Sequence, residues 1–255
     1  MTLFDLTGKV ALITGGSRGL GLQIAESYAQ AGARLILTAR KPAELEAAQH
    51  HLQRLGAQVA TLACDLSRTD DIPDVARRAM DAFGDIDILV NNAGTSWAAP
   101  MQDHPLDGWT KVMTLNVTAP FVLTREIGRR AFLPRQSGKI LNIASIGGLG
   151  GNRADTGMFT IAYNSSKAAM INFTRALATE WGRHNINVNA LAPGFFPSKM
   201  SEQLIDRLDR LLLPSVPLGR FGGADDLKGP ALLLVSDAGR HITGQCLAVD
   251  GGATA

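Results

Sequence analysis

The stretch Val10-Ala11-Leu12-Ile13-Thr14-Gly15-Gly16-Ser17-Arg18-Gly19-Leu20-Gly21 joins a short apolar run to a glycine-rich turn. The apolar run predicts a buried strand, and the apolar residues that follow at helical spacing predict a helix. In this context backbone N–H groups can approach a phosphate, and the helix N-terminus adds a favourable dipole. We therefore expect residues 15–21 to bind a phosphate group; a tight turn without a ligand is the alternative.

Strand and helix patterns alternate along the rest of the chain. After a first strand at 9–14, apolar runs predict strands at 34–39, 58–63, 86–90, 139–144, 186–191 and 246–249. Helical patterns lie at 42–55, 71–83, 106–133, 161–183 and 224–235. This alternation favours an α/β fold, in which helices cover both faces of a parallel sheet of about seven strands. No linker or composition shift interrupts residues 1–255, so we expect a single domain.

The composition argues against several kinds of partner and site. The formal net charge is +2 and 19% of the residues are charged, so we expect neither nucleic acid nor an anionic membrane as a partner. No apolar run is long enough to span a bilayer, and residues 1–9 lack a secretory signal. Cys64 and Cys246 lack a motif, which favours buried reduced thiols and a cytoplasmic location. The five scattered histidines give no support for a metal site.

Tyr163 and Lys167 are four residues apart in a predicted helix, so they share one face about a turn from each other. A phenol is a poor acid or base at neutral pH, because its unperturbed pKa is near ~10. A nearby ammonium favours the phenolate and lowers that pKa, which makes the pair a usable proton donor or acceptor. The alternative is a chance pair on a solvated helix.

Several polar or turn-forming segments directly follow predicted strands. These are the glycine-rich turn, the run Asn91-Asn92-Ala93-Gly94, Ser145, and Pro193-Gly194. In a parallel sheet of this kind ligands bind at the carboxyl ends of the strands. Residues far apart in the sequence are therefore expected to converge on one crevice.

Taken in order, these motifs resemble those of the classical short-chain dehydrogenase/reductase family. Residues 14–21 are similar to its TGxxxGxG loop, residues 91–94 to its NNAG motif, and Tyr163 with Lys167 to its YxxxK motif. Ser145 follows the fifth strand as the family serine does, and Asn116 lies where the family has a helix asparagine. The resemblance covers the whole chain and implies a Rossmann-type, doubly wound fold.

The resemblance implies a role for each of the four candidate catalytic residues Asn116, Ser145, Tyr163 and Lys167. Tyr163 would donate a proton to a carbonyl oxygen as hydride arrives, and Ser145 would hydrogen-bond the same oxygen. Lys167 would lower the tyrosine pKa and hold the nicotinamide ribose, and Asn116 would position a water that links Lys167 to solvent. For Ser145 a strand-end cap, and for Asn116 a helix kink, remain alternatives.

The end of the second strand predicts the cofactor. An acidic residue there would bind ribose hydroxyls and repel a 2′-phosphate, but the strand ends in Thr38-Ala39-Arg40. Arg40 and Arg18 would flank the adenosine ribose, and guanidinium groups suit a phosphate. The sequence therefore favours NADP(H), with two solvated surface arginines as the alternative.

The resemblance extends to the rest of the cofactor site. Asp65 would contact the adenine amino group with Leu66 beside it, and Ser198 would lie near the carboxamide. The predicted cofactor-binding residues are Gly15, Ser17, Arg18, Gly19, Leu20, Gly21, Arg40, Asp65, Leu66, Asn92, Ala93, Gly94, Tyr163, Lys167, Pro193, Gly194 and Ser198.

One departure from the family pattern concerns the segment between Ser145 and Tyr163, which is several residues longer than usual. The extra length falls in the glycine-rich residues 147–159, which we expect to be flexible and to shape substrate choice. Residues 195–217 are a second region expected to contact substrate.

The resemblance implies an NADP(H)-preferring oxidoreductase acting on a small carbonyl or alcohol. Parts of the chain are similar to 3-oxoacyl-thioester reductases, which favours a ketoreductase acting on an apolar ketone. A sugar-acid or polyol dehydrogenase of the gluconate 5-dehydrogenase type is the second hypothesis, and a catalytically silent cofactor-binding protein is the third. Family members are usually homotetramers or homodimers that associate through the helices near 107–133 and 161–183.

Overall fold

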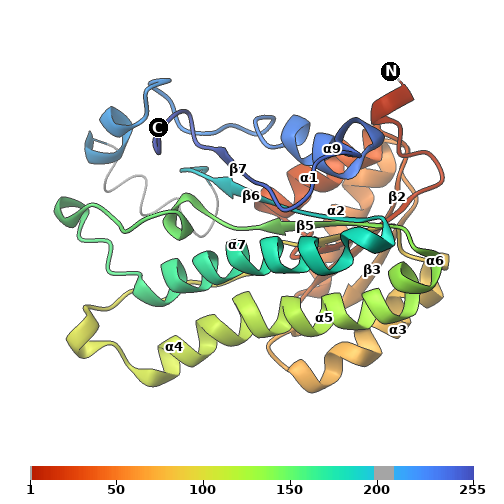
Figure 1. Ribbon diagram of the computed structural model, residues 1–255, viewed down its shortest axis with the longest axis horizontal. Coiled ribbons are helices and arrows are strands. Elements are labelled where there is room, and N and C mark those ends of the chain that lie inside the picture. Colours follow the sequence, from red (N-terminus) through yellow and green to blue (C-terminus); the bar gives the residue numbers. More distant parts are fainter. Residues whose placement is uncertain (1, 198–209) are drawn as a thin grey trace.

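Seven parallel strands form one sheet through the centre of the molecule (Figure 1). The computed structural model describes residues 2–197 and 210–255. The strands are β1 (Val10–Thr14), β2 (Arg34–Ala39), β3 (Val59–Ala63), β4 (Ile88–Asn91), β5 (Gly138–Ile143), β6 (Ile186–Pro193) and β7 (Cys246–Val249). Their order in the sheet is β3-β2-β1-β4-β5-β6-β7. The chain winds outward first on one side of β1 and then on the other, which confirms the predicted doubly wound fold.

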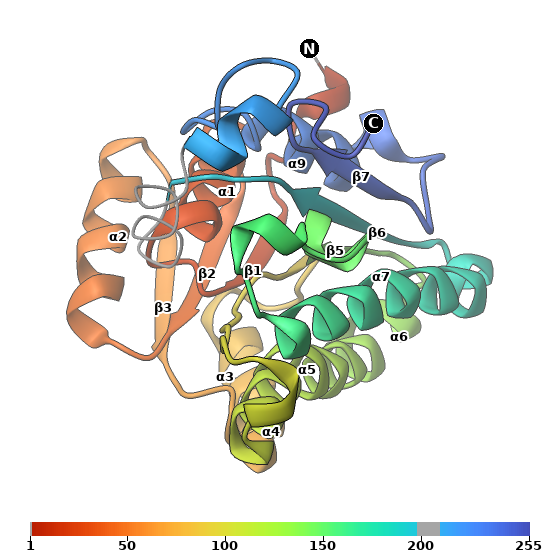
Figure 2. The same cartoon turned by 90° about the vertical axis from the view of Figure 1, so that its left-hand side faces the viewer.

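Helices cover both faces of this sheet (Figure 2). One face carries α1 (Gly19–Gln30), α2 (Pro42–Arg54) and α9 (Lys228–Val235), and the other carries α3 (Ile72–Phe83), α5 (Ala119–Ile127) and α7 (Ile161–Trp181). Successive residues of a strand point to opposite faces of the sheet and pack in the apolar core on that face. Ile13 packs in the core with Ile24 of α1, whereas its neighbour Leu12 packs in the core with Val75 of α3. Burial of both strand faces explains why the strands read as continuous apolar runs.

The predicted helix at 106–133 is one helical region with two π turns. It consists of α4 (Leu106–Met113), a π turn (Thr114–Thr118), α5, a second π turn (Gly128–Phe132) and α6 (Leu133–Arg135). Pro120 and Pro134 lie just after the π turns. Because proline lacks an N–H, it removes the α-helical hydrogen bond to the carbonyl four residues earlier. For Pro120 that carbonyl belongs to Asn116.

Short 3₁₀ turns connect several elements: Thr2–Phe4, Thr69–Asp71, Met101–Asp103, Ile146–Gly148, Ala154–Thr156, Gly182–His184, Leu213–Ser215 and Asp237–Gly239. The last of the predicted helices begins four residues later than expected, at Lys228. The preceding loop is held instead by Asp226, whose carboxylate pairs with Arg220 and accepts the Gly223 N–H at 2.7 Å. Among the described residues, no helix combines the length and apolar character required to cross a bilayer.

Candidate active site

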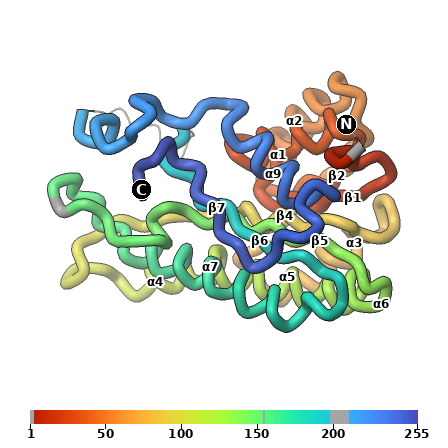
Figure 3. Tube along the Cα trace, turned by 45° about the horizontal axis from the view of Figure 1, so that its top comes forward, coloured from red at the N-terminus to blue at the C-terminus, as the bar shows by residue number. Residues whose placement is uncertain are grey.

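A pocket of ≈1180 Å³ opens along the carboxyl ends of the strands. It runs from Arg40, beyond β2, to Tyr163 on α7 and the chain segment at Phe195 beyond β6. The end of the chain also returns to this edge of the sheet (Figure 3), where Thr254 lines the pocket. The strand order thus brings together residues that are separated by more than half of the sequence.

The glycine-rich turn leads from β1 into α1 and forms one wall of the pocket. Arg18 is the N-cap of α1 and its side chain makes no capping hydrogen bond, so the first N–H groups of the helix are available to an anion. Gly15 has φ +63°, and a Cβ on it would lie 2.9 Å from Asn92 Nδ2. Glycine is therefore required at this position by conformation and by space.

Asn92 and Thr14 hold the glycine-rich turn against the end of β4. Asn92 Nδ2 donates to the carbonyl oxygens of Thr14 at 2.9 Å and Gly15 at 3.1 Å. Thr14 Oγ1 accepts the backbone N–H groups of Asn92 and Ala93 at 2.9 and 3.0 Å. These four bonds fix the shape of the turn before any ligand binds.

Charges of both signs meet at the pocket end farthest from Tyr163. Arg18 Nη1 lies 3.0 Å from Glu44 Oε1, and Lys41 Nζ lies 3.3 Å from the same oxygen. Arg40 lines the pocket beside them. The end of β2 itself carries no acid, but Glu44 in the first turn of α2 brings a carboxylate to the same place. The sequence reasoning missed Glu44 because its partner Arg18 is 26 residues away.

Asp65 and Leu66 line this end of the pocket after β3. Hydrogen bonds from the hydroxyl and the backbone N–H of Ser67, at 2.8 and 3.0 Å, hold the pKa of the Asp65 carboxyl below its usual value. Asp65 is therefore ionised at neutral pH. Its neighbour Cys64 was expected to be a buried reduced thiol; it is a free thiol, but it is only partly buried and lines the pocket. Burial raises the pKa of this thiol, which reduces its reactivity.

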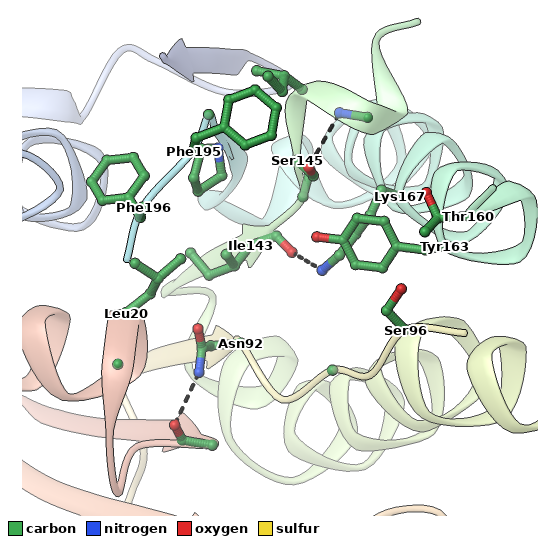
Figure 4. A pocket seen from close by; sticks show the side chains of 18 of the residues that line it. Leu20, Asn92, Ser96, Ile143, Ser145, Thr160, Tyr163, Lys167, Phe195 and Phe196 are labelled. Atoms are coloured by element: carbon green, nitrogen blue, oxygen red, sulfur yellow. Dashed lines mark hydrogen bonds between the residues drawn. The ribbon is translucent and has the colours of Figure 1, made fainter. Parts of the chain in front are cut away.

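Tyr163 and Ser145 face each other across the opposite end of the pocket (Figure 4). Ser145 Oγ accepts the Gly147 N–H at 3.1 Å, which leaves the Ser145 hydroxyl hydrogen free to be donated. Burial raises the pKa of Tyr163, and a hydrogen bond with Ser145 opposes this shift. The phenol is therefore protonated at neutral pH. The lowered pKa predicted from Lys167 is wrong for this structure, since burial outweighs the other effects.

Lys167 points past Tyr163 toward the end of β5. Its Nζ donates to the Ile143 carbonyl oxygen at 2.6 Å and lies 5.6 Å from the centroid of the Tyr163 ring (Figure 4). The side chain is buried, with a residue exposure of 6%. Burial lowers the pKa of Lys167 from 10.5 to about 8. This lysine is thus mostly charged at neutral pH, but it gives up its proton far more readily than a surface lysine does.

Asn116 lies behind the pocket and joins the loop after β4 to α7. Its Oδ1 accepts the Thr95 N–H at 2.8 Å, and its Nδ2 donates to the Thr95 carbonyl and to Ser166 Oγ, both at 2.9 Å. Ser166 Oγ in turn donates to the Tyr163 carbonyl at 2.7 Å. Asn116 therefore lies in the first π turn, and its hydrogen bonds reach α7 through Ser166. Its predicted role in positioning a water stays a prediction.

A ring of three side chains holds the long segment between Ser145 and Tyr163. Asn152 Nδ2 donates to Thr160 Oγ1 at 2.9 Å, Thr160 Oγ1 donates to Asn164 Oδ1 at 2.9 Å, and Asn164 Nδ2 donates back to Asn152 Oδ1 at 3.2 Å. Asn152 Nδ2 also donates to the Met158 carbonyl at 2.7 Å. The flexibility expected of residues 147–159 stays a prediction; in the structure these hydrogen bonds connect the loop to the first turn of α7. We call these three residues the Asn152–Thr160–Asn164 ring.

The pocket surface around Tyr163 and Ser145 is largely apolar. The side chains of Leu149, Met158, Phe195, Phe196, Pro197 and Leu212 line it, and Figure 4 labels Phe195 and Phe196. Arg153 is the one cation that the described part of the loop 147–159 contributes to the lining, and Asp155 already pairs with it at 3.1 and 2.6 Å. Both side chains of this pair are more than half exposed. The described residues therefore offer a mainly apolar surface, with polar side chains such as Ser96 and Thr160 beside Tyr163 and one paired cation in the loop 147–159.

The structure gathers most of the predicted site residues around this one pocket. Those that line it are Gly15, Ser17, Arg18, Gly19, Leu20, Arg40, Asp65, Leu66, Asn92, Ala93, Gly94, Ser145, Tyr163, Lys167, Pro193 and Gly194. Gly21 and Asn116 support it from behind, and Ser198 lies outside the described residues. The sequence reasoning missed Lys41, Glu44 and the ring around Thr160.

Comparisons with known proteins identify the class to which this fold and pocket belong. A family model described as short chain dehydrogenase matches residues 9–209. The chain belongs to the short-chain dehydrogenase/reductase family, as its motifs indicated.

Similar proteins differ in the substrates that their names give. The chain is 37% identical over 255 residues to gluconate 5-dehydrogenase of Gluconobacter oxydans, covering 99% of this chain and 97% of the relative. It is 38% identical over a 260-residue alignment to the rhamnolipids biosynthesis 3-oxoacyl-(acyl-carrier-protein) reductase of Pseudomonas aeruginosa, covering 98% and 97%. A gluconate 5-dehydrogenase from Burkholderia cenocepacia, solved in complex with NADP and tartrate, superposes with a TM-score of 0.93 at 31% identity, covering 99% and 98%.

Proposed function

We propose that this protein is an NADPH-dependent carbonyl reductase that reversibly reduces an apolar ketone, such as a 3-oxoacyl thioester, to a secondary alcohol. Residues 1–255 would act as one NAD(P)-binding domain, with residues 195–217 contributing to the substrate region. The observation that carries the substrate class is the apolar lining around Tyr163 and Ser145. The family supports the type of reaction. The glycine-rich turn at one part of the pocket and the cations at its far end support the choice of cofactor.

The residues of the pocket fit a dinucleotide with a 2′-phosphate. The glycine-rich turn presents the N-terminus of α1, which suits a pyrophosphate. Arg18, Lys41 and Arg40 gather at the far end, where an adenosine 2′-phosphate would lie. Asn92 supports the glycine-rich turn through its bonds to the Thr14 and Gly15 carbonyls. The related protein solved with NADP agrees with this assignment.

The candidate catalytic residues have complementary roles in carbonyl reduction. Bound NADPH would supply hydride to the carbonyl carbon. Tyr163, protonated at neutral pH, would donate its phenolic proton to the carbonyl oxygen. Ser145, with its lone pair engaged by Gly147, would donate its hydroxyl hydrogen to the same oxygen and stabilise the developing charge. Lys167 would hold the nicotinamide ribose and replace the proton that Tyr163 gives up.

A sugar-acid dehydrogenase is the second candidate, and Arg153 is the observation that favours it. A guanidinium at the edge of the substrate region suits a carboxylate, and gluconate 5-dehydrogenases are among the relatives. In this structure, however, Asp155 occupies both arms of Arg153. A sugar acid would therefore have to displace an existing ion pair. For this reason we propose the apolar ketone, and not the sugar acid, as the substrate.

Initial rates with NADPH on a 3-oxoacyl thioester, an aliphatic ketone and 5-ketogluconate test the proposal. We expect higher kcat/KM for the apolar ketones, and no effect of Arg153→Ala on them. Preference for 5-ketogluconate, lost in Arg153→Ala, would establish the second candidate. Cofactor binding without turnover of any carbonyl would favour a catalytically silent protein.

We also propose a cytoplasmic homotetramer or homodimer. Trp109, Phe121 and Ile161 are large apolar side chains that are more than a third exposed on α4, α5 and α7. Grouped exposed apolar side chains are typical of interfaces, which supports association through these helices. Light scattering on the purified protein would give the number of subunits; a monomer at assay concentration would contradict the proposal.

A further inference from the structure

The cations at the adenosine end of the pocket are not free in this structure, because Glu44 lies among them. One oxygen of its carboxylate faces both Arg18 Nη1 at 3.0 Å and Lys41 Nζ at 3.3 Å. The Glu44 side chain is 29% exposed, and all three residues line the pocket. A carboxylate thus occupies the position between cations that a bound phosphate would need.

The charges make these two arrangements compete. A phosphate monoester carries nearly two negative charges at neutral pH, so its oxygens repel a neighbouring carboxylate. Arg18 Nη1 already pairs with Glu44, so a phosphate that bound the same nitrogen would displace this carboxylate.

We propose that Glu44 competes with the adenosine 2′-phosphate of NADP(H) for Arg18 and Lys41. The carboxylate holds the two cations in the pocket when the cofactor is absent, and it must leave them when the 2′-phosphate binds. Glu44 thereby weakens the binding of a 2′-phosphorylated cofactor, and it leaves a cofactor with free ribose hydroxyls almost unaffected. This role rests on the proposed use of NADP(H), and it makes Glu44 a specificity-determining residue that acts against the preference set by the arginines.

Calorimetric titration with nucleotides tests the competition by Glu44 separately from the use of NADP(H), and it needs no catalytic assay. The probes are 2′,5′-ADP, which has the 2′-phosphate, and 5′-AMP, which lacks it. The variants are Glu44→Gln and its matched control Glu46→Gln, which removes the same charge from an exposed position on α2. Two residues apart on a helix, the two side chains point to different faces.

We expect Glu44→Gln to tighten 2′,5′-ADP binding about 3- to 20-fold, because an exposed ion pair is worth up to ~1 kcal/mol and a like-charge repulsion is removed as well. Binding of 5′-AMP should change less than 2-fold (roughly ~0.4 kcal/mol). Glu46→Gln should affect neither probe beyond a small, salt-sensitive change. In an Arg18→Ala background the gain from Glu44→Gln should shrink, because one of the released cations is missing.

Two results would overturn the proposal, and they differ from each other. Unchanged or weaker 2′,5′-ADP binding by Glu44→Gln, with a wild type that prefers 2′,5′-ADP to 5′-AMP, would show that Glu44 only positions the cations. A wild type that binds the two probes equally would overturn the NADP(H) assignment and the role of Glu44 with it.

Discussion

Replacing Thr160 by valine would open the Asn152–Thr160–Asn164 ring with little change in side-chain shape. The Thr160 hydroxyl accepts one hydrogen bond from Asn152 and donates one to Asn164. After the substitution Asn152 Nδ2 keeps the Met158 carbonyl, and Asn164 Nδ2 keeps Asn152 Oδ1. The substitution therefore removes two hydrogen bonds of the ring, and Asn164 Oδ1 loses the one that it accepts from Thr160.

The size of the effect follows from these two bonds. Each is worth roughly 0.5–1.5 kcal/mol net, and because the ring is only partly buried we expect a loss of about 1–2 kcal/mol in the stability of the loop conformation. That corresponds to about a 5- to 30-fold shift toward open forms of residues 147–159. If these residues form a wall of the substrate site, KM for the ketone rises by up to that factor. Cofactor affinity stays unchanged, because Arg18 and Arg40 lie at the other end of the pocket.

Two measurements check this prediction independently. Steady-state kinetics of Thr160→Val should show a raised ketone KM, a smaller change in kcat, and an unchanged Kd for NADPH. Trypsin should cleave the exposed loop at Arg153 faster than in the wild type. The control is Thr179→Val, which removes a hydroxyl that donates to the Arg175 carbonyl on an exposed part of α7. An unchanged KM together with unchanged cleavage at Arg153 would refute the role of the ring.

Four further predictions concern the proposed proton donor, its pH dependence, the buried lysine and the cofactor. Tyr163→Phe should bind NADPH normally and lose ~100-fold or more in turnover; near wild-type rates would exclude Tyr163 as the acid. Because burial raises the pKa of Tyr163, wild-type alcohol oxidation should rise with pH on the alkaline side, and a flat profile would contradict this. Because the pKa of Lys167 is about 8, the wild type carries a buried charge on this lysine at lower pH. In unfolding measurements Lys167→Met should therefore have a higher free energy of unfolding than the wild type at neutral pH. This difference should shrink by roughly 3 kcal/mol as the pH rises to the usual lysine pKa, because the wild type then loses its buried charge. Arg40→Ala should raise the KM for NADPH ~10-fold and leave that for NADH nearly unchanged; equal effects on both would place Arg40 away from the 2′-phosphate.

The order of the elements could be predicted because each depends on local pattern. The apolar run at Val10–Thr14 is buried on both sides, so its composition alone indicates a central strand. The crossover pattern then fixes which residues lie at the carboxyl edge, and Asn92 and Ser145 are found there. The π turns also have a local signal that was not used, since Pro120 and Pro134 each remove one helical hydrogen bond.

What could not be predicted depends on partners that are distant in the sequence. Glu44 appears from the sequence as one more surface acid on a helix, and its relevance comes only from its contact with Arg18. The loop at 147–159 is rich in glycine, which indicates freedom of the unfolded chain but not the bonds that Asn164 makes in the folded one. The pKa of Tyr163 depends on how deeply α7 is buried, which the spacing to Lys167 does not show.

In the proposed function Lys167 replaces the proton that Tyr163 gives up, and the surroundings of Asn116 bear on how a buried lysine would itself be resupplied. Asn116 has used three of its four hydrogen-bonding positions, and the remaining one is a lone pair of Oδ1. A Cβ on Gly94 would lie 3.3 Å from that oxygen and 3.7 Å from Lys167 Nζ, so both polar atoms border the space that this glycine leaves open. Pro120 also frees the main-chain carbonyl of Asn116 from its α-helical partner. Polar groups that converge on a space of this size suit a bound water, which needs two to four partners. A side chain at position 94 would enter the space between Asn116 and Lys167. In the proposed mechanism Gly94 would therefore keep room for a water that resupplies protons, as well as for the cofactor.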